Sequence, residues 1–200
     1  MPSESDTIEL SDDELRDIAG YAAACARRVL PLFERNLPNL PADTRPRDAI
    51  DAAYAFAGGD RRTGALRQRA WAAYRAAQEA AVPAAADAAR AASHAAAAAY
   101  LHPKASAHQV KHILGAAAHA ARAEELAEEL AEESAQELAG GSASADRPRV
   151  TTETLEWARL HAPTAVTAVL RRLPSAPPGG GRVGELLRDL DTALRAALRP

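Results

Sequence analysis

The stretch PAAADAARAASHAAAAAY, residues 83–100, decides the fold class of this chain. Alanine has the highest helix propensity of all residues, and about a quarter of the chain is alanine. Pro83 can occupy the first turn of a helix, whereas Pro103, beyond the far end, cannot continue one. Since a helix that is apolar nearly all round is stable only when it is covered, the stretch predicts a helix packed among other helices.

Towards the N-terminus, apolar residues recur at helical spacing in three further segments. The first begins at residues 11–14 (SDDE), a capping box, and Pro31 should bend its helix or end it nearby. The second runs from Thr44 to the pair Gly58-Gly59, which is a helix-ending signal. The third covers about residues 63–81.

Towards the C-terminus, residues 106–109 (SAHQ) form a second capping box, which opens a fifth helix. This helix continues into an acidic extension with a narrow apolar seam, residues 124–137. Glycine- and serine-rich sequence then indicates a linker. The remaining helical patterns cover about residues 152–161, 163–173 and 183–198, with a proline- and glycine-rich linker at 174–181.

These patterns predict an all-α fold with no strands. We expect an alanine-rich antiparallel bundle of about five helices over residues 11–139, preceded by a flexible lead at 1–10. A linker at 140–150 should lead to a smaller C-terminal helical appendage at 151–200. The patterns leave open whether this appendage packs on the bundle.

Charge and composition narrow the possible partners. The net charge of −3 argues against a bulk nucleic-acid binder. No uncharged apolar stretch reaches the roughly 20 residues that span a bilayer, so no membrane partner is expected. The acidic N-terminus lacks the basic start of a signal peptide, which favours a cytoplasmic protein. Cys25 lies on an apolar stripe and is therefore expected to be a small buried hydrophobe.

Motifs that would indicate catalysis are missing from the sequence. The glycine-rich run GGGRVGEL, residues 179–186, lacks the lysine and hydroxyl residue of a phosphate loop and follows no strand pattern. There is no nucleophile elbow of the GxSxG type and no CxxC pair. We therefore expect a non-enzymatic protein with no catalytic residues and no cofactor.

Two charged segments are candidate partner-binding surfaces. Arginine and aromatic residues together are typical of interfaces, and an acidic helix can steer a basic partner. The alternatives are a solvated helix face for the charges, a small core for the aromatic pair, or a nucleic-acid contact for the arginines. The candidate residues are Arg61, Arg62, Arg67, Arg69, Trp71 and Tyr74 in the first segment, and Glu124 and Glu128 in the acidic extension.

Four histidines form an alternative, metal- or ligand-binding hypothesis. His108 and His112 are one helical turn apart, His119 follows two turns later, and His94 on the preceding helix could lie opposite. An i, i+4 pair of histidines can bind zinc, but a site needs three or four committed ligands. The competing interpretation is that these side chains fill polar niches between alanine-lined helices.

Part of the chain resembles a known family. The segment RPRDAIDAAYAFAGGDRRTGALRQRAWAAYRAAQEAAVPAAADAARAASHAAAAAY, followed by AHQVKHILGAAAHAARA and preceded by CARRVLPLFE, is similar to the putative immunity protein family of bacterial polymorphic toxin systems. The anchors are the non-alanine residues, and Ser93 stands where glycine is usual. An insertion at 101–106 separates the helix at 83–100 from the fifth helix. The tail after Ala145 is typical of actinobacterial members. The anchoring residues are Arg45, Pro46, Ile50, Trp71, His94, His108, His112, Leu114 and Gly115.

The resemblance implies an all-helical protein that binds and neutralises a cognate toxin. It transfers no catalytic residues. Some similar proteins are labelled as a DNA exonuclease, but this sequence lacks the phosphate loop and metal-binding carboxylates of such enzymes. The cognate toxin and the oligomeric state stay open.

Overall fold

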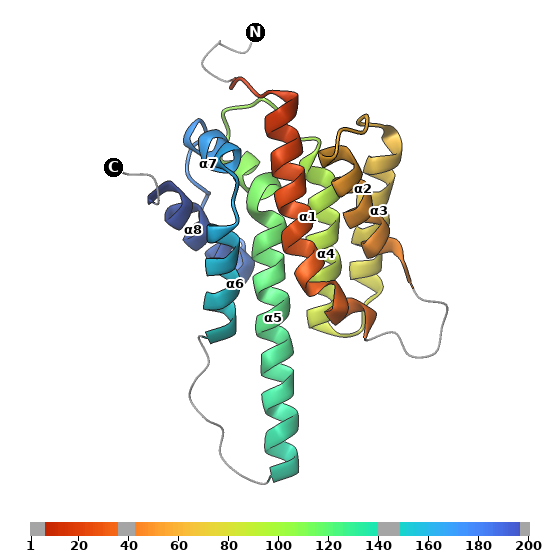
Figure 1. Ribbon diagram of the computed structural model, residues 1–200. Helices are drawn as coiled ribbons and strands as arrows, with labels where there is room; N and C mark the ends of the chain where they lie inside the picture. The colour runs from red at the N-terminus through yellow and green to blue at the C-terminus, as the bar shows by residue number, and fades with distance from the viewer. Residues whose placement is uncertain (1–6, 36–42, 140–148, 197–200) are drawn as a thin grey trace.

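The computed structural model describes residues 7–35, 43–139 and 149–196. Over these ranges the chain forms eight α-helices and a single 3-10 turn, with one isolated bridge between Thr7 and Lys104 and no strand, so the all-α prediction is confirmed (Figure 1). The predicted lead up to residue 6 and the predicted linker at 140–148 lie outside the described residues. The helices are α1 (Asp12–Glu34), α2 (Arg45–Ala57), α3 (Gly64–Glu79), α4 (Pro83–Ala98), α5 (Val110–Ala139), α6 (Arg149–Leu160), α7 (Thr164–Arg171) and α8 (Gly181–Ala196), with the turn η2 (Ala107–Gln109).

Local signals place the helix ends. The predicted capping box of α1 is present, with the Glu14 amide donating to Ser11 Oγ at 3.2 Å and the Ser11 amide donating to Glu14 Oε2 at 2.9 Å. The second predicted box is wrong. Ser106 Oγ accepts from the His108 amide at 3.3 Å, but Gln109 Oε1 instead accepts from the His102 amide, at 3.2 Å. The Gln109 side chain stabilises the preceding loop, so α5 begins through a 3-10 turn.

α4 lies at the centre of the bundle and packs against α1, α2, α3 and α5 (Figure 1). Eleven of its residues are buried, and ten of them are alanine. Small side chains let neighbouring helix backbones approach closely, while larger side chains on the flanking helices fill the remaining space. The largest of these fully buried side chains include Ile18 of α1 and Ile113 and Leu114 of α5.

The C-terminal helices pack on the bundle. α6 and α8 lie against α5, and α7 contacts α1, on the opposite side of α5 from α2 and α3 (Figure 1). Val166, Leu170, Leu186 and Leu190 belong to the same buried cluster as the bundle residues. The segment whose packing the sequence left open is therefore part of one core.

Polar contacts also connect the two parts of the chain. The buried hydroxyl of Tyr21 in α1 donates to the carbonyl oxygen of Ala158 in α6 at 3.1 Å. Arg172, just after α7, donates to the Glu9 carbonyl oxygen at 2.5 Å and pairs with Glu14 of the α1 cap. These bonds hold α1 and the residues just before it against the C-terminal part of the chain.

The C-terminal half of α5 projects beyond the other helices (Figure 1). Leu130 on this extension is 49% exposed, and the glutamates after it are largely exposed. Among the described helices, none is both long and apolar enough to cross a membrane.

Candidate partner-binding surface

An aromatic cleft of about 720 Å³ opens between α3, α4 and α5. The buried face of α3 carries Leu66, Ala70 and Ala73, and the neighbouring positions turn Trp71 and Tyr74 outward. Their side chains are 59% and 40% exposed and meet edge to face, with ring centroids 5.9 Å apart. The core alternative for this aromatic pair is therefore wrong, and the pair forms part of the surface.

Basic groups surround this aromatic cleft. The Arg67 guanidinium carbon lies 4.3 Å from the ring centroid of Tyr100, a distance suited to a cation–π contact. Lys111, His112 and His102 complete the basic side of the cleft. None of the described residues that line it carries a carboxylate.

A second cleft, of about 350 Å³, lies on the other side of Lys111 and His94, and we call it the glycine-loop cleft. His108 and His119 line it from the bundle, and the loop at 177–180 with the start of α8 closes it. The three glycines at 179–181 have φ values of +88°, +79° and +57°, which glycine adopts readily.

Arg188 of α8 holds this loop in place, by donating to the carbonyl oxygens of Gly179 at 2.7 Å and Pro177 at 3.2 Å. The buried carboxylate of Asp191 accepts from the Ala176 amide at 3.0 Å. The segment between α7 and α8 is therefore fastened to α8 by side-chain contacts.

His94 stands between the two clefts. Its ring stacks on that of His119, with centroids 5.1 Å apart and planes 25° apart. Gly115 makes room for it, because a Cβ at that position would lie 2.6 Å from His94 Nδ1. Burial, together with repulsion from the neighbouring histidines and Lys111, lowers the pKa of His94 to about 3, so this ring is neutral at pH 7.

The four histidines predicted as an alternative metal set do not converge. His119 Nδ1 lies 2.6 Å from a carboxylate oxygen of the buried Asp87, and His94 stacks on the ring of His119. His108 is exposed on the 3-10 turn, and burial lowers the pKa of His112. Within the described ranges, no group of three or more histidine, cysteine or acidic side chains could hold a metal ion.

The arginine and aromatic candidates divide between two faces. Arg67, Trp71 and Tyr74 come together at the aromatic cleft. Arg61 and Arg69 line a separate, acidic cleft between α2 and α3, where Arg69 lies 3.7 Å from Asp48.

The remaining three candidate residues, Arg62, Glu124 and Glu128, do not line the aromatic cleft. Arg62 donates to the Ala99 carbonyl oxygen at 2.9 Å and so holds the turn before α3 against the end of α4. Glu124 accepts a hydrogen bond from Thr154 of α6, and burial raises the pKa of its carboxyl group. Glu128 is half-buried on α5.

Sequence reasoning missed Tyr100, His102 and Lys111 as parts of the surface. Of these three, only Lys111 had a signal in the sequence, because it is one of two lysines in the chain and stands between His108 and His112. Cys25 behaves as predicted. It is buried, and burial raises the pKa of its thiol to about 12.

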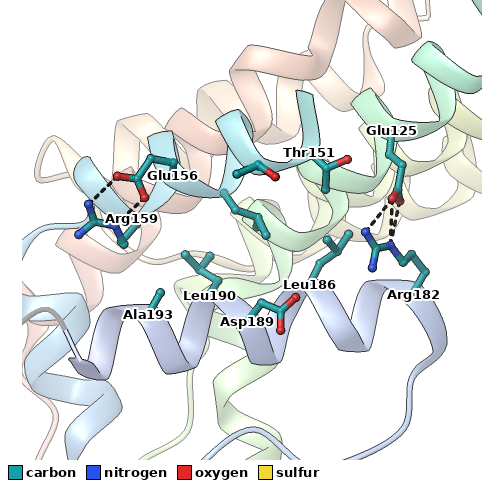
Figure 2. A pocket seen from close by; sticks show the side chains of 11 residues that line it. Glu125, Thr151, Glu156, Arg159, Arg182, Leu186, Asp189, Leu190 and Ala193 are labelled. Atoms are coloured by element: carbon teal, nitrogen blue, oxygen red, sulfur yellow. Dashed lines mark hydrogen bonds and ion pairs between the residues drawn. The ribbon is translucent and has the colours of Figure 1, made fainter. Parts of the chain in front are cut away.

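A further cleft, of about 380 Å³, lies between α5, α6 and α8 (Figure 2). Two arginines of this cleft are paired with glutamates, whereas Asp189, which also lines it, has no ion pair with a described residue. Arg182 lies 2.8 Å from Glu125, and Arg159 lies 2.6 Å from Glu156 (Figure 2). The first of these pairs joins α8 to α5 and so has a structural role, whereas the second lies within α6.

Comparison with known proteins places most of the chain within a described family. The family model described as Imm-5 like putative immunity protein matches residues 9–141. This range includes α1 to α5 and the described residues that line the aromatic cleft. No curated protein and no solved structure matches the chain.

Proposed function

The chain belongs to the Imm-5 like putative immunity protein family, and we propose that it neutralises a cognate toxin by binding it directly through the aromatic cleft. Family membership supports an immunity-like role and a protein partner. The aromatic cleft lies wholly within the part of the chain that the family model matches.

The observation that carries this proposal is the exposure of Trp71 and Tyr74 beside Arg67. Tryptophan, tyrosine and arginine are the residues that most often dominate binding energy at protein interfaces. Here a tightly packed alanine core leaves an aromatic pair at the surface. An exposed Trp71 has no evident role in the packing of the bundle, so binding is the simplest reason for its position.

Binding alone could neutralise a toxin, either by covering its active site or by holding it in an inactive conformation. A partner side chain that packs against the aromatic residues of the cleft excludes water and gives a slow dissociation rate. Neither route requires chemistry by this chain. The acidic extension of α5, including Glu124 and Glu128, is a second proposed contact, which would steer a basic region of the toxin.

Rescue of toxin-expressing cells tests the proposal. The toxin is sought among the products of neighbouring genes and expressed with this protein. We expect wild type to protect, and Trp71→Ala combined with Tyr74→Ala to lose protection and to weaken binding of the purified toxin. Leu160→Ala, which removes an apolar side chain that is 64% exposed on α6, is the matched control and should protect normally. Full protection by the double variant would exclude the aromatic cleft as the binding surface.

A further inference from the structure

Basic groups gather at the aromatic cleft and the glycine-loop cleft. Lys111 lines both, Arg67 lines the first, and five of the six histidines of the chain lie at one or the other. Within the described part of the chain, no carboxylate lines either cleft. Arg67 and Lys111 form no ion pair with a described residue. The two strong cations therefore face solvent uncompensated.

In two other clefts of the molecule, arginines are paired with carboxylates. Arg69 faces Asp48 in the α2–α3 cleft, and Arg182 binds Glu125 in the cleft of Figure 2. The chain as a whole carries a net charge of −3. The surface around Lys111 is thus positive, whereas the molecule as a whole is negative. A negatively charged partner would therefore be attracted by this local surface and not by the net charge of the protein.

We infer that these two clefts bind an acidic segment of the protein partner, with an aromatic or large apolar side chain next to its carboxylates. The apolar side chain would lie against Trp71, Tyr74 and Tyr100, and the carboxylates would pair with Arg67 and Lys111. This inference rests on the proposed function, because it names the chemistry of the toxin surface that the aromatic cleft contacts.

The arrangement favours a short acidic peptide segment over a nucleic acid. A nucleic-acid backbone is usually held by many lysine or arginine contacts along a track. Of the described residues that line the clefts, only Arg67 and Lys111 carry fixed positive charge, and His94, whose pKa is lowered by burial, is neutral at pH 7. Two cations beside an aromatic floor match one or two carboxylates and an adjoining apolar side chain.

Selection from a library of random short peptides displayed on phage tests this chemistry even before the toxin is identified. The bait is the full-length protein. We expect enrichment of peptides that combine aspartate or glutamate with an aromatic residue. The affinity of a synthetic copy of the enriched peptide, measured by fluorescence anisotropy, should fall about tenfold or more in Arg67→Glu combined with Lys111→Glu.

The matched control reverses the same number of charges on and directly after α1, which lines neither cleft, in Arg27→Glu combined with Arg35→Glu, and should leave peptide affinity within about twofold of wild type. Enrichment of basic or uncharged peptides, or of nothing, would overturn the inference. So would tight, cleft-dependent binding of a single-stranded oligonucleotide, since that would make a polyanion the occupant.

The toxin experiment separates the two proposals. If a toxin binds and its affinity survives reversal of Arg67 and Lys111, the proposed function stands and the acidic-segment inference fails. If the peptides bind as expected but no neighbouring product binds, the clefts have the inferred chemistry and the immunity proposal fails.

Discussion

At the residue scale, Gly115 and His94 show how closely the helices of this bundle approach one another. The His94 ring occupies the space that a side chain on α5 would need, and it is held there by stacking on His119. Because the ring is stacked on His119 and lies against Gly115, it cannot move away from a new side chain at position 115 without losing this stack. Glycine at 115 is therefore a packing requirement.

Replacing Gly115 with alanine should destabilise the protein. The added Cβ would lie 2.6 Å from His94 Nδ1, so α4 and α5 must separate or His94 must leave its stack. We expect a loss of about 1–3 kcal/mol in the free energy of unfolding, measured by denaturant titration. Gly64→Ala, at an exposed helix start with nothing within 4 Å, is the control and should be neutral or stabilising. Equal stability of the two variants would contradict this account.

His94 should also make the protein sensitive to mild acid. Its pKa is lowered from 6.5 to about 3 in the folded protein, mainly by burial, so below pH 6.5 the unfolded chain binds a proton that the folded chain does not. Stability contributed by the neutral ring is therefore complete above pH 6.5 and is lost as the pH falls, by up to about 1.4 kcal/mol per pH unit.

Urea titrations at pH 7 and pH 5 test this sensitivity. In His94→Gln, which cannot titrate, the free energy of unfolding should fall less between these pH values than in wild type. An unchanged m-value in both proteins is the control, because it shows that the same surface becomes exposed. Identical pH slopes in the two proteins would show that another group causes the acid sensitivity.

At the scale of elements, the bond between Tyr21 and Ala158 joins the first helix to the sixth. Tyr21→Phe keeps the ring but leaves the buried Ala158 carbonyl oxygen without this donor. We expect a cost of about 1–2 kcal/mol by thermal or denaturant unfolding. Tyr54→Phe removes a hydroxyl from a tyrosine that is 38% exposed and should change stability by less than about 0.5 kcal/mol. If both variants unfolded like wild type, the hydrogen bond between α1 and α6 would contribute nothing measurable to the free energy of unfolding.

Helix identity and most helix ends could be predicted because their signals are local. Ser11 and Glu14 interact within one turn, and the Gly58-Gly59 pair ends α2 whatever surrounds it. Gln109 shows where local reasoning fails, since a capping box and a loop contact with His102 compete for the same side chain. Only the tertiary structure decides between them.

The candidate surface could be predicted only in part, for a related reason. Trp71 and Tyr74 stand beside the buried stripe of α3, so helical spacing permits either a core or a surface position. The approach of Lys111 and Tyr100 to Arg67 depends on how α3, α4 and α5 pack together. An alanine-rich pattern specifies that helices pack closely, but it carries little information on which helices are neighbours.

At the scale of the whole molecule, the C-terminal helices and the family-matched bundle share one core. Leu190 of α8 is 1% exposed and belongs to the same cluster as Ile113 and Leu114 of α5. A cavity there should therefore weaken the entire molecule. Leu190→Ala should lower the free energy of unfolding by about 2–5 kcal/mol, whereas Leu160→Ala, at an exposed position, should have little effect.

The two tryptophans allow this shared core to be tested directly. Trp71 lies in the bundle and Trp157 in α6, so Trp157→Phe leaves a reporter of the bundle and Trp71→Phe a reporter of the C-terminal helices. In each background, Leu190→Ala should shift the fluorescence midpoint in urea by the same amount, because both regions unfold in one cooperative transition. A shift seen by Trp157 alone would show that the C-terminal helices unfold separately. The bundle would then have to be stable without α8, which the burial of Leu190 against α5 argues against.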